Sequence, residues 1–151
     1  MQTEELSTLI TSWVPDVKPG ISKQYPDLIL PVEKLHEVMK SLRENPSTKM
    51  DYLFCLTGTD RKDGFHILYH LTSSEFHHAV VLRTILIDKV NPIIPTVSDI
   101  WRAAEYYERE VFDLLGIRFE NHPDLRRLFL EDDWVGYPLR KDYKDAFTLE
   151  H

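Results

Sequence analysis

Three strand-like runs follow one another in the middle of the chain, and this succession constrains the fold more than any other feature. They cover residues 51–59 (DYLFCLTGT), 65–72 (FHILYHLT) and 79–87 (AVVLRTILI). Their β-branched and aromatic residues are typical of strands rather than helices. The DRKDG connection between the first two predicts a hairpin, with Gly64 at a positive φ.

Segments with helical periodicity surround these runs. Apolar residues recur at helical spacing in residues 3–13, 31–46 and 97–115, and DLILPV (residues 27–32) reads as a short strand. The order α-β-α-β-β-β-α predicts an α+β fold, a two-layer sandwich with helices on a mixed or antiparallel four-stranded sheet.

The third helical segment carries a charge inside its apolar stripe. On a helical wheel, Glu108 falls among the apolar side chains, whereas Glu105, Arg109 and Asp113 form an i, i+4 series that we expect to face solvent. An unpaired buried carboxylate is costly, so Glu108 is expected to accept from backbone amides or from an arginine. The arginines of the C-terminal segment are the natural candidates, because a guanidinium matches a carboxylate with two donors: Arg126, Arg127 and Arg140.

The ends of this helix carry recognisable signals. Thr96 or Ser98 is expected to cap its N-terminus, and Asp99 suits the first turn. Gly116 predicts a left-handed C-terminal stop.

After Gly116 the chain has no sustained periodicity and contains the turn signals HPD, VG and YP. Its arginines, aspartates and aromatic residues argue against simple disorder and indicate a segment that docks on a partner. We therefore expect an α+β domain over residues 1–116, an irregular docking tail over 117–148, and an affinity-tag remnant at 149–151 (LEH).

Composition excludes several classes of function. The net charge of −7 disfavours non-specific nucleic-acid binding. The only cysteine, Cys55, is expected to be a small buried residue, and His66 and His70 would lie ~13 Å apart on one strand, too far to share a metal. No apolar run approaches the ~18 residues of a membrane span, and residues 1–10 lack the basic region of a signal peptide.

The stretch EREVFDLLGIRFENHPDLRRLFLEDDWVGYPLRKDY (residues 108–143) closely resembles the signature of the C subunit of respiratory complex I, the proton-pumping NADH:quinone oxidoreductase. The shared motifs are E-R-E, G-I, H-P-D-L-R-R, D-W-x-G and P-L-R-K-D-Y, in this order. Weaker similarity extends upstream through LTGTD and ILYHL. One departure lies at Tyr106 or Tyr107, near which the family often has tryptophan.

The resemblance implies a non-catalytic subunit of the hydrophilic arm of the complex, on the cytoplasmic side of the cell membrane. No cofactor is expected in this chain, because NADH, FMN, iron–sulfur clusters and quinone belong to partner subunits in this family. The implied partners are the subunits that hold the quinone pocket and the iron–sulfur clusters, with the C-terminal tail wrapped over them.

Two groups of functional residues are expected on this basis. A structural brace would consist of Glu108, Arg109 and Glu110. The partner-docking residues would be His122, Pro123, Asp124, Arg126, Arg127, Trp134, Arg140, Lys141, Asp142 and Tyr143.

Two alternatives remain open at this point. The chain could be the equivalent subunit of a related membrane-bound hydrogenase or of another donor-dependent quinone reductase. It could also be a stand-alone acid/base enzyme that uses Glu108, or Asp132 with Asp133, in a concave pocket with a raised carboxyl pKa.

Overall fold

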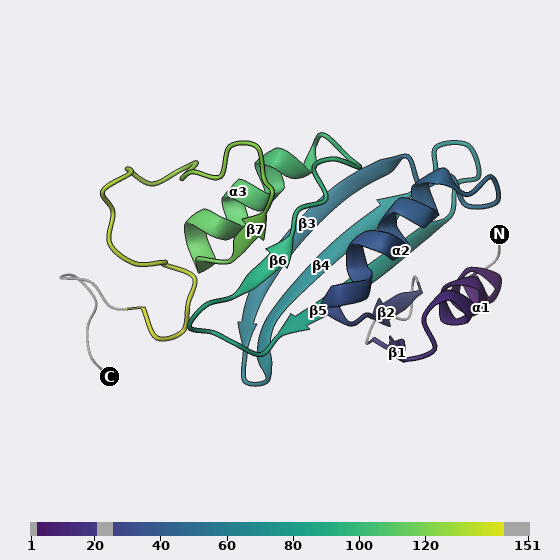
Figure 1. The fold of residues 1–151 in the computed structure, drawn as a ribbon, viewed down its shortest axis with the longest axis horizontal. Helices are drawn as coiled ribbons and strands as arrows, with labels where there is room; N and C mark the ends of the chain where they lie inside the picture. The colour runs from purple at the N-terminus through teal and green to yellow at the C-terminus, as the bar shows by residue number, and fades with distance from the viewer. Residues whose placement is uncertain (1–2, 21–25, 144–151) are drawn as a thin grey trace.

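A computed structural model of the chain describes residues 3–20 and 26–143 (Figure 1). Residues 144–148 of the expected tail and the expected tag remnant 149–151 lie outside the described residues. The elements, in order, are α1 Thr3–Trp13, β1 Lys18–Pro19, β2 Asp27–Ile29, α2 Val32–Glu44, β3 Tyr52–Arg61, β4 Gly64–Thr72, β5 Ala79–Leu86, β6 Ile93–Pro95, α3 Ala104–Leu115 and β7 Arg118–Glu120.

The main sheet is mixed and mostly antiparallel, with the strand order β1-β2-β5-β4-β3. Among the described strands of this sheet, only the pair β2 and β5 is parallel, with Leu28 opposite Leu82. The α+β class is confirmed, but the expected count of four strands is wrong because β1 adds a fifth strand at the edge. A strand of two residues, Lys18–Pro19, is too short to show any alternation in the sequence.

The expected β3–β4 hairpin is confirmed, and its connection is shorter than the DRKDG segment, since Arg61 already pairs with Gly64. Gly64 has a φ of 143°, and a Cβ there would lie 2.4 Å from the carbonyl oxygen of Leu86. The prediction of a positive φ at Gly64 is therefore confirmed, and the close approach of β5 gives a second reason for glycine.

The core lies between one face of this sheet and the apolar sides of α1, α2 and α3. Figure 1 shows α2 in front of the strands and α3 next to β3. The apolar stripe of α2 is buried as its periodicity predicts: Leu35, Val38, Met39 and Leu42. On β3, Gly58 lets α3 approach, because a Cβ at Gly58 would lie 2.8 Å from a methyl carbon of Leu115 and 3.2 Å from one of Val111. The position of α3 next to β3 therefore fixes the point from which the C-terminal segment leaves the helix.

A second, two-stranded sheet pairs β6 with β7 in parallel, with Ile94 opposite Phe119. Ile117 and Phe119 are buried in the core cluster. The packed body therefore continues past Gly116, where the sequence predicts a domain boundary, and the segment without regular structure starts at Asn121.

Helix α3 begins later than the sequence predicts. Residues 98–103 form turns, and the N-cap residue Ala103 makes no side-chain cap hydrogen bond. The expected cap at Thr96 or Ser98 is therefore wrong. The C-terminal stop is confirmed: Gly116 has a φ of 76°, and its N–H donates to the carbonyl of Phe112 at 2.8 Å.

Candidate partner interface

Glu108 lies on the buried side of α3 and has no exposed surface. Its Oε2 accepts the Val97 N–H at 2.9 Å, and its Oε1 accepts the Thr96 hydroxyl. The expected arginine partner is therefore wrong. The loop before α3 provides a hydroxyl and a backbone amide instead. A backbone amide was the other kind of donor expected for a buried carboxylate.

His122 packs against this carboxylate without compensating its charge. Its Nε2 lies 3.9 Å from Glu108 Oε1 and donates to the Glu105 carbonyl at 3.0 Å. Its Nδ1 accepts the Asp124 N–H at 2.9 Å, so the ring is assigned as neutral with the proton on Nε2.

Burial raises the pKa of the Glu108 carboxyl to about 7, although the bonds from Thr96 and Val97 oppose the rise. The charges of Asp99 and Glu105 add to it. Solvent does not reach this carboxyl, so burial in the folded chain is the main cause of the raised pKa. Asp132 and Asp133, the other candidates for acid/base chemistry, lie on an exposed part of the chain. The structure thus contradicts the expectation of an open pocket around Glu108.

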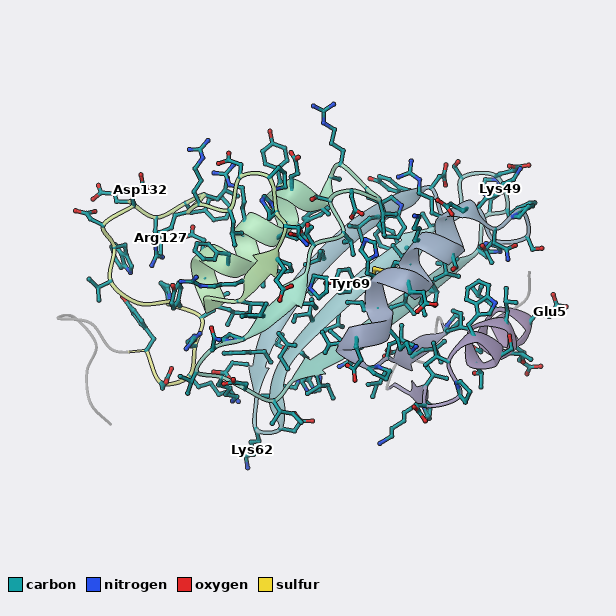
Figure 2. The ribbon with its side chains drawn as sticks, in the orientation of Figure 1. Glu5, Lys49, Lys62, Tyr69, Arg127 and Asp132 are labelled. Atoms are coloured by element: carbon teal, nitrogen blue, oxygen red, sulfur yellow. The ribbon has the colours of Figure 1, made fainter. Side chains whose placement is uncertain are left out.

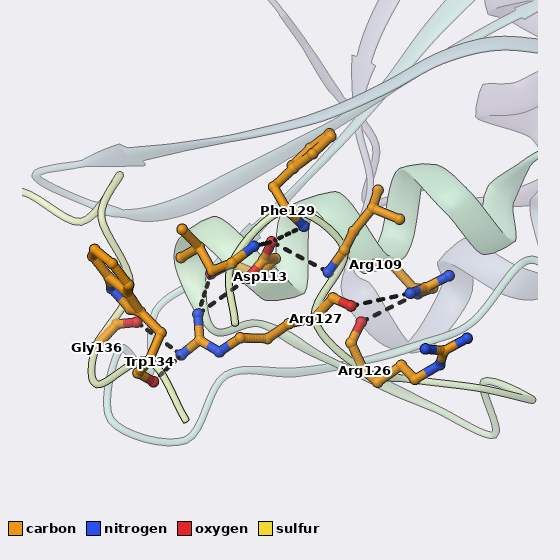
Figure 3. A network of polar contacts seen from close by, with 9 residues as sticks. Arg109, Asp113, Arg126, Arg127, Phe129, Trp134 and Gly136 are labelled. Atoms are coloured by element: carbon orange, nitrogen blue, oxygen red, sulfur yellow. Dashed lines mark hydrogen bonds and ion pairs between the residues drawn. The ribbon is translucent and has the colours of Figure 1, made fainter. Parts of the chain in front are cut away.

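Asp113 provides the carboxylate–arginine pair that was expected at Glu108 (Figure 3). It has no exposed surface, so the expectation that it faces solvent is wrong. Its Oδ1 accepts Arg127 Nη1 at 3.1 Å, and its Oδ2 accepts the backbone N–H groups of Leu128, Phe129 and Leu130 at 3.2, 2.7 and 3.1 Å. Burial alone would raise the pKa of Asp113, but these donors outweigh it and lower the pKa below its ordinary value.

The Arg127 side chain connects α3 to the chain around Trp134 and Gly136, which lies further along the C-terminal segment. Besides Asp113, its Nη2 donates to the carbonyls of Trp134 and Gly136 at 3.0 and 2.9 Å. Its guanidinium also lies 5.0 Å from the ring centroid of Tyr137, a cation–π contact. One buried side chain therefore holds two backbone stretches to the helix.

Arg109 and Arg140 fasten the same segment at two further points. Arg109 donates to the carbonyls of Arg126 and Arg127 at 3.2 and 3.0 Å. Arg140 donates to the carbonyls of Leu115 and Lys89 at 2.6 and 3.1 Å. Both arginines are therefore occupied within the chain itself.

Close approach of the segment to the end of α3 depends on Gly116. A Cβ at Gly116 would lie 2.6 Å from the Tyr137 ring and 2.9 Å from Arg140 Nη2. The backbone also joins here, since Leu139 N–H donates to the Leu114 carbonyl at 2.9 Å.

The remaining expected residues lie nearer the surface. Arg126 forms an exposed ion pair with Asp124 at 3.0 Å. The Lys141 backbone N–H donates to Asp60 at 2.9 Å. Pro123, Trp134 and Asp142 are exposed, and Tyr143 is partly buried.

Glu110 borders a cavity of about 160 Å³ between β3 and α3. Cys55 lines the same cavity and is only partly buried. The expectation that Cys55 is a small buried residue is therefore wrong. Burial raises the pKa of the Cys55 thiol, and the charge of Glu110 raises it further.

Among residues 3–20 and 26–143, no three His, Cys, Asp or Glu side chains are arranged to hold a metal ion. In the same ranges, no helix is long and apolar enough to cross a membrane.

Sequence reasoning missed Asp113 and the exposed apolar residues Phe129 and Val135. Nothing local marks Asp113, because its partners follow much later in the chain. A signal for the other two was present, since FLEDDWV places apolar residues on both sides of three carboxylates.

Fold and site together define a small α+β domain whose last helix holds an irregular C-terminal segment. The profile of the family described as "Respiratory-chain NADH dehydrogenase, 30 Kd subunit" matches residues 28–147. The chain belongs to this family.

Curated relatives carry names from the same complex. The C/D subunit of NADH-quinone oxidoreductase from Phocaeicola vulgatus is 51% identical over 120 residues, 79% of this chain and 23% of that protein. The C subunit from Chloroherpeton thalassium is 43% identical over 104 residues, 68% and 43% of the two chains. The C subunit from Roseiflexus castenholzii is 37% identical over 134 residues, which cover 85% of this chain and 76% of that protein. The chain thus spans less than half the length of the first two relatives.

Two solved structures share the fold. A chain of the membrane-bound sulfane sulfur reductase, an archaeal respiratory membrane complex, has a TM-score of 0.77 and 27% identity, and the match covers 95% of this chain and 86% of that one. The trypsin-resistant fragment (1-134) of Nqo5 has a TM-score of 0.66 and 27% identity, covering 83% and 100%.

Proposed function

We propose that this chain is a non-catalytic structural subunit of the hydrophilic arm of an NADH:quinone oxidoreductase. In that role it supports electron transfer from NADH to quinone, coupled to proton translocation. The observation that carries the proposal is the family match over residues 28–147, and the names of the relatives agree with it.

The geometry of the carboxylates supports a structural role. Glu108 is closed off and bonded to Thr96 and Val97, and Asp113 is occupied by Arg127 and by backbone amides. Glu108 thus fixes the loop before α3, and Asp113 holds the C-terminal segment on the same helix, as expected of a structural brace. NADH, FMN, iron–sulfur clusters and quinone would then be bound by partner subunits.

The proposed partners are the subunits that form the quinone pocket and those that hold iron–sulfur clusters. The chain would reach the cytoplasmic side of the cell membrane through these partners. Arg109 and Glu108 would act as the brace, and the surface of the C-terminal segment would provide the docking contacts.

The equivalent subunit of a quinone reductase with another electron donor is the weaker candidate. Its support is the likeness to a chain of the sulfane sulfur reductase at 27% identity, whereas relatives named NADH-quinone oxidoreductase reach 51%.

Affinity purification of the tagged full-length protein from mildly solubilised native membranes tests the proposal. We expect the other subunits of the NADH:quinone oxidoreductase to copurify, together with NADH:quinone activity. An untagged strain and a tagged soluble protein of similar charge are the controls. Recovery of none of these subunits would overturn the proposal, and recovery of subunits with a different donor specificity would establish the alternative.

A further inference from the structure

Residues 128–135, here called the presented loop, are held at their base from inside the protein (Figure 3). At the first end, the amides of Leu128, Phe129 and Leu130 donate to Asp113. At the second end, the carbonyls of Trp134 and Gly136 accept from Arg127. Both ends therefore depend on one ion pair, between two side chains that are 0% and 10% exposed.

This arrangement sets the shape of the presented loop before any partner arrives. Three backbone amides and two carbonyls are satisfied within the chain, and the charges that bind them are shielded from water. A preorganised binding element loses less conformational entropy on association than a flexible one.

The presented loop carries large apolar side chains that its own fold does not cover. Phe129 is 65% exposed, Trp134 41% and Val135 88%. Two of these three exposed side chains are aromatic, and aromatic residues contribute much of the binding energy at protein interfaces.

Three exposed carboxylates, Glu131, Asp132 and Asp133, stand between these apolar residues. Figure 2 shows Asp132 at the outer end of the segment, with Arg127 nearer to α3. Within the described residues none of the three forms an ion pair. Adjacent like charges on a fixed loop favour a partner of opposite charge.

The charge also decides between kinds of partner. A membrane surface rich in anionic lipids would repel these carboxylates. A second copy of the chain, with its own net charge of −7, would also be repelled. A protein surface that combines apolar contacts with a surplus of lysine and arginine fits both features.

We infer that the presented loop is a preformed docking element for such a basic and apolar surface on a partner protein. This inference rests on the proposed function, because the partner would be another subunit of the same complex. It reassigns the docking contacts: Arg127 and Arg140 are occupied within the chain, and Phe129, Trp134 and Val135 with their neighbouring carboxylates meet the partner.

Two variants of the tagged full chain, expressed in place of the wild type, test the inference: Asp132→Lys with Asp133→Lys, and Trp134→Ala. The amount of the other subunits that copurify from native membranes is measured. We expect each variant to lower recovery on the order of tenfold, by charge repulsion in the first and by loss of an aromatic contact in the second.

Matched controls separate a local effect from a general one. Glu33→Lys with Glu44→Lys makes the same change of charge on the exposed side of α2, and Val90→Ser removes an apolar side chain that is 94% exposed. Both are expected to recover the other subunits at the wild-type level. Thermal unfolding of each purified variant confirms that the chain remains folded.

The outcomes distinguish this inference from the proposed function. If the wild type recovers the other subunits and the loop variants recover them equally well, the inference is wrong and the proposed function stands. If the wild type recovers none, the proposed function itself fails. Binding of the wild type to anionic vesicles, or a dimer that Trp134→Ala dissociates, would overturn the inference in favour of a lipid surface or a second copy.

Discussion

Asp113 and Arg127 form an ion pair of 3.1 Å between Oδ1 and Nη1, and both side chains are almost completely buried. One belongs to the regular helix α3 and the other to a segment without regular structure. Because three amides converge on the same carboxylate, this pair joins the C-terminal segment to the body of the protein.

Replacing Asp113 by alanine should destabilise the protein strongly. The change leaves Arg127 and three backbone amides without their acceptor, and breaking a buried pair in this way costs about 3–5 kcal/mol. Urea unfolding of the full chain measures the loss. Asp124→Ala is the control, because its pair with Arg126 is exposed and worth at most about 1 kcal/mol. Equal losses for the two variants would contradict the brace at Asp113.

Glu108 should make stability depend on pH, because its carboxyl pKa rises from the ordinary 4.5 to about 7 on folding. Between these values the folded state holds a proton that the unfolded state has released. The contribution of Glu108 to the free energy of unfolding is therefore greatest below pH 4.5 and falls by about 3 kcal/mol as pH rises to about 7.

Glu108→Gln isolates this effect, since glutamine can still accept from Val97 and contact the Thr96 hydroxyl. Unfolding free energies measured from pH 4.5 to 8 should show a flatter curve for the variant, with the difference growing toward pH 8. Glu44→Gln, at an exposed position on α2, is the matched control and should leave the slope unchanged. Parallel curves for wild type and Glu108→Gln would refute the pKa shift.

Gly116→Ala should loosen the segment from the end of α3. The φ of 76° costs a non-glycine residue about 1 kcal/mol, and the new Cβ would also collide with the Tyr137 ring. In a Tyr137→Ala background the collision is absent, so Gly116→Ala should cost less there. A double-mutant cycle of unfolding free energies checks this, and additive losses would show that ring contact plays no part.

Arg127→Ala should release the presented loop without unfolding the body. The carbonyls of Trp134 and Gly136 lose their donor, so chymotrypsin should cleave after Phe129 and Trp134 faster than in the wild type. Arg126→Ala is the neighbouring control, because among the described residues the Arg126 side chain pairs only with exposed Asp124. Unchanged cleavage in Arg127→Ala would show that the loop is held by other contacts.

Much of the fold was predictable because its signals are local. The hairpin at Gly64, the buried stripe of α2 and the stop at Gly116 each follow from a few neighbouring residues. The edge strand β1 was not predictable because it has only two residues. The β6–β7 pairing was not predictable because both strands are short and lie far apart in sequence.

The partners of the two carboxylates on α3 show the same limit. The helical wheel predicts from the sequence alone that Glu108 is a buried charge. It places Asp113 on the side of the helix that faces solvent, because the wheel contains no information on the C-terminal segment that covers this side. Only the folded chain brings Thr96 to Glu108 and Arg127 to Asp113. Periodicity records which side of a helix the sheet covers, whereas hydrogen bonds between distant segments depend on the path of the chain in space.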